Sequence, residues 1–349
     1  MKFSNLCTGL PVALAVFVGS FSAVVGQTPS QNGASLATAL SAAEAGDWDK
    51  ATVIAARNQD PIAVEIIEWK RLRAGEGRFD EYEAFLNSNA DWPGLPLLQK
   101  VSEEAIPERL NPQRVVNYFA TQNPQTGWGA LRLAQAYQAM GKPAEAGAEV
   151  VYAWREFSLS EDEQNAMWSA FSGTLKAHNA YRLDLLLWKR KITEAGRMLS
   201  IVPASKRALA EVRIALQRDK KGVNAMISAL PMAAQRDAGL AYDRFRWRLN
   251  NDLGDSAREM LVQRSGSAES LGRPEFWSSR RRTNARRVMR NGDYRDAYYM
   301  ASQHFLTPDQ TGYSDLEWLA GYLALRKLND PARAALHFRN FRASITSPI

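Results

Sequence analysis

The chain of 349 residues contains a single cysteine, Cys7, and only three histidines. Cys7 lies within a predicted export signal, so the mature chain would contain no cysteine, and both disulfides and thiol catalysis are excluded. The histidines are His178, His304 and His337. No two of them have the spacing of metal ligands, so we expect packing or surface histidines, no metal site and no cofactor.

Other familiar signals are also missing. After the N-terminal segment, no apolar run is long enough to span a membrane. The sequence contains no Gly-x-Ser-x-Gly elbow, no glycine-rich phosphate loop and no paired-carboxylate motif. The alternation of apolar and polar residues that predicts strands is nearly absent, so the sequence predicts an all-α protein.

The N-terminus has the features of a secretory signal. Lys2 supplies the positive end, Gly9–Val25 is uncharged and mostly apolar, and Gly26–Gln27 is a plausible cleavage point. We therefore expect a signal peptide over 1–26, a polar flexible leader over 27–36 and a periplasmic protein. An uncleaved N-terminal anchor is the alternative.

The formal net charge is +7. A basic exported protein suggests an anionic polymer or surface as its partner, although net charge indicates little about fold. Export makes nucleic acid an unexpected partner for such a protein.

The stretch Asp315–Phe341 predicts a helical hairpin. Spacings of three and four place one apolar face on its first helix, formed by Leu316, Leu319, Ala320 and Leu323. Asn329 can end this helix, because Asn tolerates the left-handed conformation. Asp330 can then cap the second helix, with Pro331 at its first position. We expect the buried stripe to continue through Ala332, Ala335 and Phe338.

Similar hairpins recur along the chain. Two alanines lie twelve positions apart, with a turn residue seven positions after the first. The pairs are Ala39 and Ala51 around Gly46, Ala134 and Ala146 around Gly141, Ala285 and Ala297 around Gly292, and Ala320 and Ala332. The last two pairs are offset by 35 positions, close to the tetratricopeptide period of about 34 residues. The pattern predicts a superhelical array of antiparallel hairpins over 37–349, a tetratricopeptide-like solenoid that could close into a ring. A non-repetitive helical domain with ordinary glycine turns is the alternative.

Six stretches carry a resemblance to a known family. They are DWPG (Asp91–Gly94), HNAYRLDLLLWKR (His178–Arg190), AYDRFRWR (Ala241–Arg248), LGRPEFWSSRRR (Leu271–Arg282), MRNGDYRDAYYMASQH (Met289–His304) and DLEWLAGYLALRKLNDPARAALHF (Asp315–Phe338). As an ordered set they resemble the N-terminal helical region of soluble lytic murein transglycosylases. The resemblance covers roughly Ala37–Ile349. It implies a superhelical, often ring-like array, which in that family precedes a lysozyme-like catalytic domain.

The sequence departs from the family in its catalytic motifs. The family's catalytic glutamate lies in a Glu-Ser pair that a Gly-Leu-Met-Gln stretch follows, and this stretch does not occur here. The near match Glu269-Ser270 stands before a piece that resembles the non-catalytic region. A lytic transglycosylase needs a glutamic acid with a raised pKa in an apolar cleft, so we expect an array without its catalytic domain.

Arginines gather in one segment, where Glu275 is their only acidic neighbour. They are Arg273, Arg280, Arg281, Arg282, Arg286, Arg287 and Arg290. Arg282, Arg286 and Arg290 recur every four residues and share a helix face. Guanidinium groups can pair with the carboxylates of murein stem peptides. The alternative is a solvated face, or pairing with acids of the next hairpin such as Asp315 and Glu317.

Aromatic residues alternate with arginines in Tyr242–Arg248. Arg244 and Arg246 could support sugar stacking there, although the aromatics are more often core and the arginines bury only their stems. We assign Trp48, Trp69, Trp92, Trp154, Trp188 and Trp318 to helix packing. The expected polymer-binding residues are Arg280, Arg282, Arg286, Arg290, Arg244 and Arg246.

The sequence thus predicts a non-catalytic periplasmic array that positions peptidoglycan strands, with cell-wall proteins as further possible partners. The main alternative is an exported tetratricopeptide-like scaffold whose groove binds a protein. A third hypothesis is that the chain is catalytic as it stands, with Glu269 as the catalytic acid.

Overall fold

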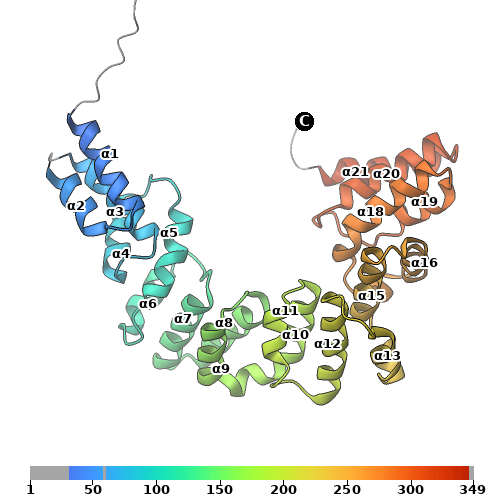
Figure 1. Ribbon diagram of the computed structural model, residues 1–349, viewed down its shortest axis with the longest axis horizontal. Coiled ribbons are helices and arrows are strands. Elements are labelled where there is room, and N and C mark those ends of the chain that lie inside the picture. Colours follow the sequence, from blue (N-terminus) through green and yellow to red (C-terminus); the bar gives the residue numbers. More distant parts are fainter. Residues whose placement is uncertain (1–30, 58–59, 346–349) are drawn as a thin grey trace, which may run out of the picture. The chain divides into compact units, whose positions relative to one another are not determined.

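The structure, a computed structural model, describes residues 31–57 and 60–345. Within these residues there are α-helices, short 3-10 helices and turns, and there is no strand, which confirms the all-α class (Figure 1). The chain divides into two compact units between Leu98 and Gln99. The predicted signal peptide over 1–26 lies outside the described residues.

The described part of the first unit contains four whole helices and the start of a fifth, which crosses the division. They are α1 (Gln31–Glu44), α2 (Trp48–Arg57), α3 (Pro61–Arg73), α4 (Phe79–Ser88) and α5 (Leu95–Ser102). Ala39 and Ala51 are fully buried where α1 meets α2, and Gly46 closes α1 with a φ of 76°. Helix α1 begins at Gln31, so residues 31–36 of the predicted leader are helical, as their helix-forming Ala and Leu allow.

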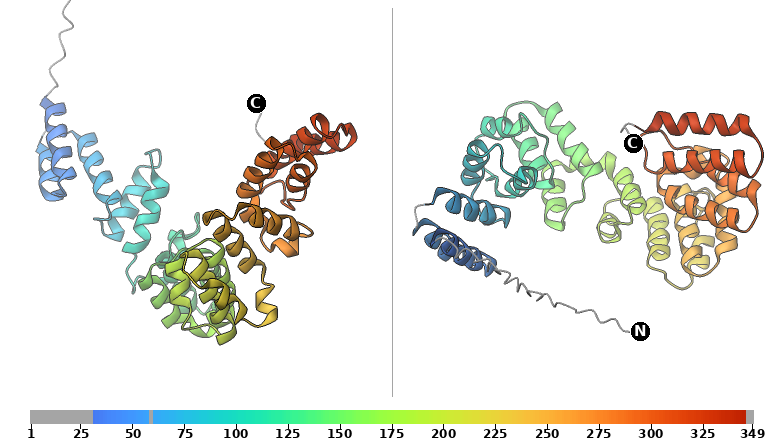
Figure 2. Two further views of the ribbon diagram at one scale, coloured as in Figure 1. Left: turned by 45° about the vertical axis from the view of Figure 1, so that its right-hand side comes forward. Right: turned by 90° about the horizontal axis from the view of Figure 1, so that it is seen from above.

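The second unit contains the remaining helices. They are η1 (Glu103–Ala105), α6 (Pro112–Tyr118), α7 (Gly127–Ala139), α8 (Pro143–Glu156), α9 (Glu161–Leu175), η2 (Lys176–His178), α10 (Asn179–Trp188), α11 (Ile192–Met198), α12 (Ala204–Gln217), α13 (Val223–Ser228), α14 (Met232–Gln235), α15 (Ala238–Asn250), α16 (Gly254–Arg264), α17 (Ala268–Leu271), α18 (Pro274–Arg290), α19 (Tyr294–Ser302), α20 (Tyr313–Arg326) and α21 (Pro331–Ser344). Most helices in this unit contact their neighbours in sequence (Figure 2). Its apolar core is accordingly divided into several clusters along the chain rather than gathered into one.

Helices α20 and α21 form the predicted hairpin. Leu316, Leu319, Ala320 and Leu323 are buried. Asn329 takes the left-handed conformation, with a φ of 51°, and Asp330 accepts a hydrogen bond of 3.0 Å from the backbone N–H of Arg333. The turn after α20 and the start of α21 therefore use the residues that the sequence indicates.

The second half of the predicted stripe is wrong at two of its three positions, and Phe338 is half-buried. Ala332 and Ala335 are exposed, whereas Ala334 and His337 are buried. Helix α21 is rotated so that Ala334, His337 and Phe338 face α20, because His337 binds Glu317 and the Phe338 ring packs on Gly321. The contact of Phe338 with Gly321 holds it there, because a Cβ at Gly321 would lie 2.8 Å from the Phe338 ring.

Fully buried arginines connect one helix to other helices and loops. Arg182 of α10 donates to the carbonyl oxygens of Trp154 and Phe157 and pairs with Glu194 at 3.4 Å. Arg281 of α18 donates to the Met300 carbonyl at 2.9 Å and to Ser265 Oγ at 2.7 Å. Each guanidinium thus satisfies backbone or side-chain acceptors that would otherwise be buried without a partner.

A buried carboxylate organises the last hairpin. Glu317 of α20 accepts hydrogen bonds from His304 Nε2 at 3.1 Å and from His337 Nδ1 at 2.7 Å. The Leu306 N–H donates to His304 Nδ1, so the Nε2 atom of His304 carries the hydrogen. Burial opposes ionisation of Glu317, but the two histidines outweigh it and lower its pKa to about 2.

This carboxylate should make the protein sensitive to acid. Because the folded-state pKa of Glu317 lies below the ordinary value of about 4.3, its stabilisation is present above that pH and is lost as the pH falls towards 2. We expect Glu317→Gln to lower the free energy of unfolding by about 2–3 kcal/mol at pH 6 and by much less at pH 2.5. Urea unfolding at both pH values measures this.

The exposed Glu145 of α8 provides the matched control. Glu145→Gln should change the free energy of unfolding by less than about 0.5 kcal/mol at either pH. An equal loss at pH 6 and at pH 2.5 for Glu317→Gln would contradict an ionised, histidine-bound carboxylate.

Candidate functional site

The arginine segment forms helix α18, and the helix separates its arginines by side. Trp277, Arg281, Ala285 and Val288 are buried. Arg282 is half-buried, whereas Arg286 and Arg290 are exposed on the same side of the helix. These three form a row, which we call the arginine row. Arg280 is also exposed, but it lies about 160° around the helix from Arg282 and outside the row.

One member of the arginine row has an acidic partner. Arg282 Nη1 hydrogen bonds to Asp315 Oδ2 of α20. Because of this ion pair, Arg282 is not a free cation. Pairing with Asp315 is the alternative to polymer binding that the sequence indicated. Arg286 and Arg290 make no ion pair within 31–57 and 60–345 and remain available to an anion.

The two arginines predicted on α15 do not join the row. Arg244 and Arg246 are half-buried and, two positions apart, point to different sides of α15. Burial, together with Arg248 and Arg264, lowers the pKa of Arg244, and Arg246 Nη1 lies 3.3 Å from the Tyr242 hydroxyl. Tyr242 and Phe245 are core residues, so the core interpretation of this segment holds.

Trp318 differs from the expected helix packing. Trp154 and Trp188 are buried, but the Trp318 residue is 42% exposed. Its ring stacks on Tyr322 with centroids 5.5 Å apart and planes 9° apart. Trp318 and Tyr322 lie one and two turns beyond Asp315, so this stacked pair continues the side of α20 that meets Arg282.

The proposed acid of the catalytic reading is not in a cleft. Glu269 lies exposed on the short helix α17. Burial raises the pKa of another acid, Asp243, to about 6. However, Asp243 is 1% exposed and its oxygens accept hydrogen bonds from Arg213 and Gln217, so it cannot reach a substrate.

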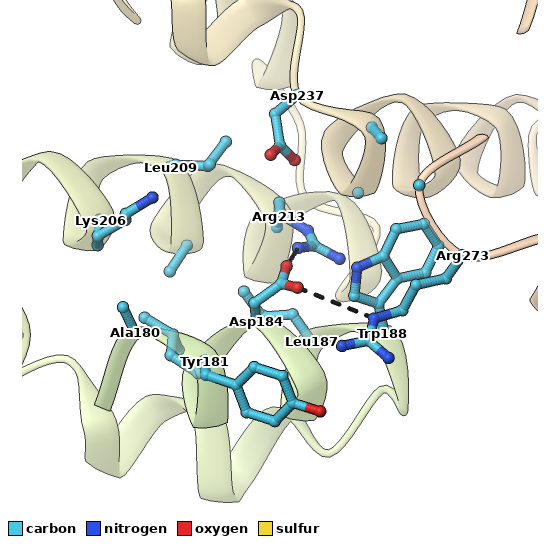
Figure 3. Close-up of a pocket in the computed structure, with 15 residues that line it drawn as sticks. Ala180, Tyr181, Asp184, Leu187, Trp188, Lys206, Leu209, Arg213, Asp237 and Arg273 are labelled. Atoms are coloured by element: carbon cyan, nitrogen blue, oxygen red, sulfur yellow. Dashed lines mark hydrogen bonds and ion pairs between the residues drawn. The ribbon is translucent and has the colours of Figure 1, made fainter. Parts of the chain in front are cut away.

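A pocket of about 410 Å³ opens between α10, α12 and the starts of α15 and α18 (Figure 3). Its walls combine apolar and polar groups in similar measure, with Tyr181 and Trp188 as aromatic members. Four accessible charged side chains line it, namely Asp184, Lys206, Asp237 and Arg273. Lys206 and Arg273 lie on opposite sides of the Asp184–Arg213 pair. Its volume lies within the range of small-molecule sites.

Arg213 holds the carboxylate at the centre of this pocket. Arg213 is 1% exposed and donates to Asp184 Oδ1 and to Asp243 Oδ2, both at 2.7 Å. The second oxygen of Asp184 lies 4.0 Å from Arg273 Nε, and the Asp184 side chain is 45% exposed. Asp184 is therefore oriented from beneath and still open to a ligand.

Two glycines make room for this arrangement. A Cβ at Gly239 would lie 2.4 Å from Arg213 Cζ, so α15 can start there only without a side chain. Gly272 has a φ of 73°, and a Cβ there would lie 2.7 Å from Ala238 Cβ. These glycines allow the loop before α18 and the first turn of α15 to approach Arg213.

Sequence reasoning missed the pocket, because its charged residues belong to four separate segments. Asp184 lies in the stretch His178–Arg190, whose sequence indicates only a family resemblance. Asp237 indicates only the start of a helix. Among the described residues, no group of three or more His, Cys, Asp or Glu side chains is arranged to hold a metal ion. No helix in the described ranges combines the length and apolarity needed to cross a membrane.

Comparisons with known proteins add no relative. Neither a protein-family model, nor a curated protein, nor a solved structure matches the chain.

The glycine beside Arg213 gives a test of the site's packing. We expect Gly239→Ala to lower the free energy of unfolding by about 2–4 kcal/mol, because the new methyl group would displace a buried, paired guanidinium. Gly147 of α8 is the control, because its nearest neighbour would be 3.8 Å from a Cβ. Gly147→Ala should be neutral or should stabilise by up to about 1 kcal/mol. Chemical denaturation of both variants measures the difference, and equal effects would contradict the close approach.

Proposed function

We propose that this chain is the non-catalytic helical array of a periplasmic lytic transglycosylase of peptidoglycan, and that it positions murein strands for cleavage. The ordered resemblance of its segments to that family supports the proposal. So do the all-α fold and the packing of helices on their sequence neighbours, which suit a superhelical, tetratricopeptide-like array.

The observation that carries the proposal is the surface formed by α18 and α20. Ser278 lies beside Gly312, and Arg282 contacts Asp315, so successive contacts advance in the same direction along both helices. Arg286 and Arg290 extend the exposed side of α18 beyond this contact. Trp318 and Tyr322 extend that of α20.

Such a surface matches the chemistry of a murein strand. Guanidinium groups pair with carboxylates, which the stem peptides carry. The faces of aromatic rings are apolar and can cover the C–H faces of sugar rings. One partner that carries both groups at short intervals would use the arginine row and the stacked pair together.

The arginine row can be tested by reversing its free charges. We expect Arg286→Glu with Arg290→Glu to weaken co-sedimentation with purified sacculi at least fivefold, because about 1 kcal/mol is lost at an exposed ion pair. Trp318→Ala should also weaken it, and added salt should weaken the wild type. The melting temperature should stay nearly constant, because both arginines are exposed.

Lys220→Glu with Lys221→Glu is the matched control, because both lysines are exposed and the change in net charge is the same. The control variant should sediment with sacculi like the wild type. Equal losses in both double variants would show a non-specific charge effect and remove the arginine row from the proposal.

The absence of catalysis has its own test. We expect the mature chain, incubated with sacculi, to release no 1,6-anhydro muropeptides that mass spectrometry detects, while an intact lytic transglycosylase releases them in parallel. The physical reason is that Glu269 is exposed and Asp243 is sealed by its partners. Release of these products would make the chain an enzyme, and Glu269 would be the first residue to replace.

One observation favours the alternative, an exported scaffold that binds a protein. Helix α21 exposes Ala332, Ala335 and Leu336 on one side, and the Leu336 residue is 49% exposed. An exposed apolar helix face is a common element of protein interfaces. A specific protein recovered from periplasmic extract, without salt-sensitive binding to sacculi, would support this alternative.

A further inference from the structure

The pocket between α10, α12 and α15 presents balanced charges. Arg213 and Asp243 are both 1% exposed and bind each other, so they compensate one another beneath the surface. The accessible charges that remain are two carboxylates, Asp184 and Asp237, and two cations, Lys206 and Arg273. A ligand with one sign of charge would face a group of like charge as well as a partner. A ligand with both signs can satisfy each group.

The cations in this pocket are not equally free. Arg273 lies 4.0 Å from Asp184 and 4.0 Å from Glu275, so it already faces two carboxylates. Lys206 of α12 is exposed and forms no ion pair within the described ranges. Lys206 is therefore the cation available to a ligand carboxylate.

The carboxylates also have free capacity. Asp237 uses Oδ1 to accept the Leu240 N–H at 2.8 Å as the cap of α15, and Oδ2 has no hydrogen bond in the described structure. Asp184 uses Oδ1 for Arg213, and Oδ2 has only the 4.0 Å contact with Arg273. An ammonium group has three donors and suits two such oxygens.

We propose that this pocket binds a zwitterionic amino acid or short peptide. The ammonium group lies between Asp184 and Asp237, and the free carboxylate pairs with Lys206. The apolar side chain packs on the wall that Leu187, Trp188 and Leu209 contribute. The volume of about 410 Å³ lies within the usual range for small ligands.

This site does not depend on the proposed function. The pocket uses α10, α12 and the starts of α15 and α18, whereas the arginine row and the stacked pair lie further along α18 and on α20. Binding of murein could fail while the pocket is real, and the reverse also holds.

Isothermal titration calorimetry on the full-length protein tests whether the pocket binds such ligands. The probes are the dipeptides Ala-Ala, Ala-Leu and Ala-Phe, together with N-acetylated and C-amidated Ala-Leu. We expect Ala-Leu to bind, and we expect each blocked form to bind at least tenfold more weakly, because each loses a charge-assisted contact.

Two substitutions keep the fold and remove one charge each. Asp237→Asn retains a good helix cap, and Lys206→Gln changes an exposed side chain. Each should weaken Ala-Leu binding about tenfold or more. The controls Asp162→Asn and Lys221→Gln, at exposed positions away from the pocket, should bind like the wild type.

The possible results separate cleanly. Binding of Ala-Leu that is lost in the blocked forms and in both pocket variants supports the proposal. Binding that is unchanged by N-acetylation or by Asp237→Asn would overturn it. No dipeptide binding at concentrations up to about 10 mM would also overturn it.

Discussion

Buried guanidinium groups fix how the helices of the second unit pack. Arg182, Arg213 and Arg281 are almost completely inaccessible, and each reaches acceptors on another helix or loop. Removing one partner of such a buried pair typically costs about 3–5 kcal/mol. These few polar links therefore contribute to the specificity with which the helices of this unit pack on one another.

Consecutive arginines of α18 have different environments and different contacts. In the run Arg280–Arg282, the first arginine is exposed, Arg281 is a core residue, and Arg282 pairs with Asp315. Composition alone cannot separate them, because all three add equally to the positive charge. Their positions around the helix axis separate them. The four-residue spacing from Arg282 to Arg286 and Arg290 is therefore what predicts which arginines share a helix face.

Local signals predicted local structure well. Gly46, Gly141, Gly292 and Asn329 take the left-handed conformation at helix ends, and the alanines around the first three turns are buried. Apart from the pairing with Asp315, which the sequence offered as an alternative, contacts across helices were not predicted, because they depend on the rotation of each helix about its axis. That rotation exposed Ala335 and Trp318, and it gathered Asp184, Lys206 and Asp237 from three segments into one pocket.

The exposed part of the arginine row has a thermodynamic consequence. Arg286 and Arg290 lie about 6 Å apart along α18, which is shorter than the screening length of about 8 Å at physiological ionic strength. Like charges at this spacing repel each other and weaken a helix by about 0.2–0.5 kcal/mol. A polyanion bound to this side of α18 would reduce the repulsion between Arg286 and Arg290. A helix that carries such a row of like charges would therefore be more stable with a bound polyanion than without one.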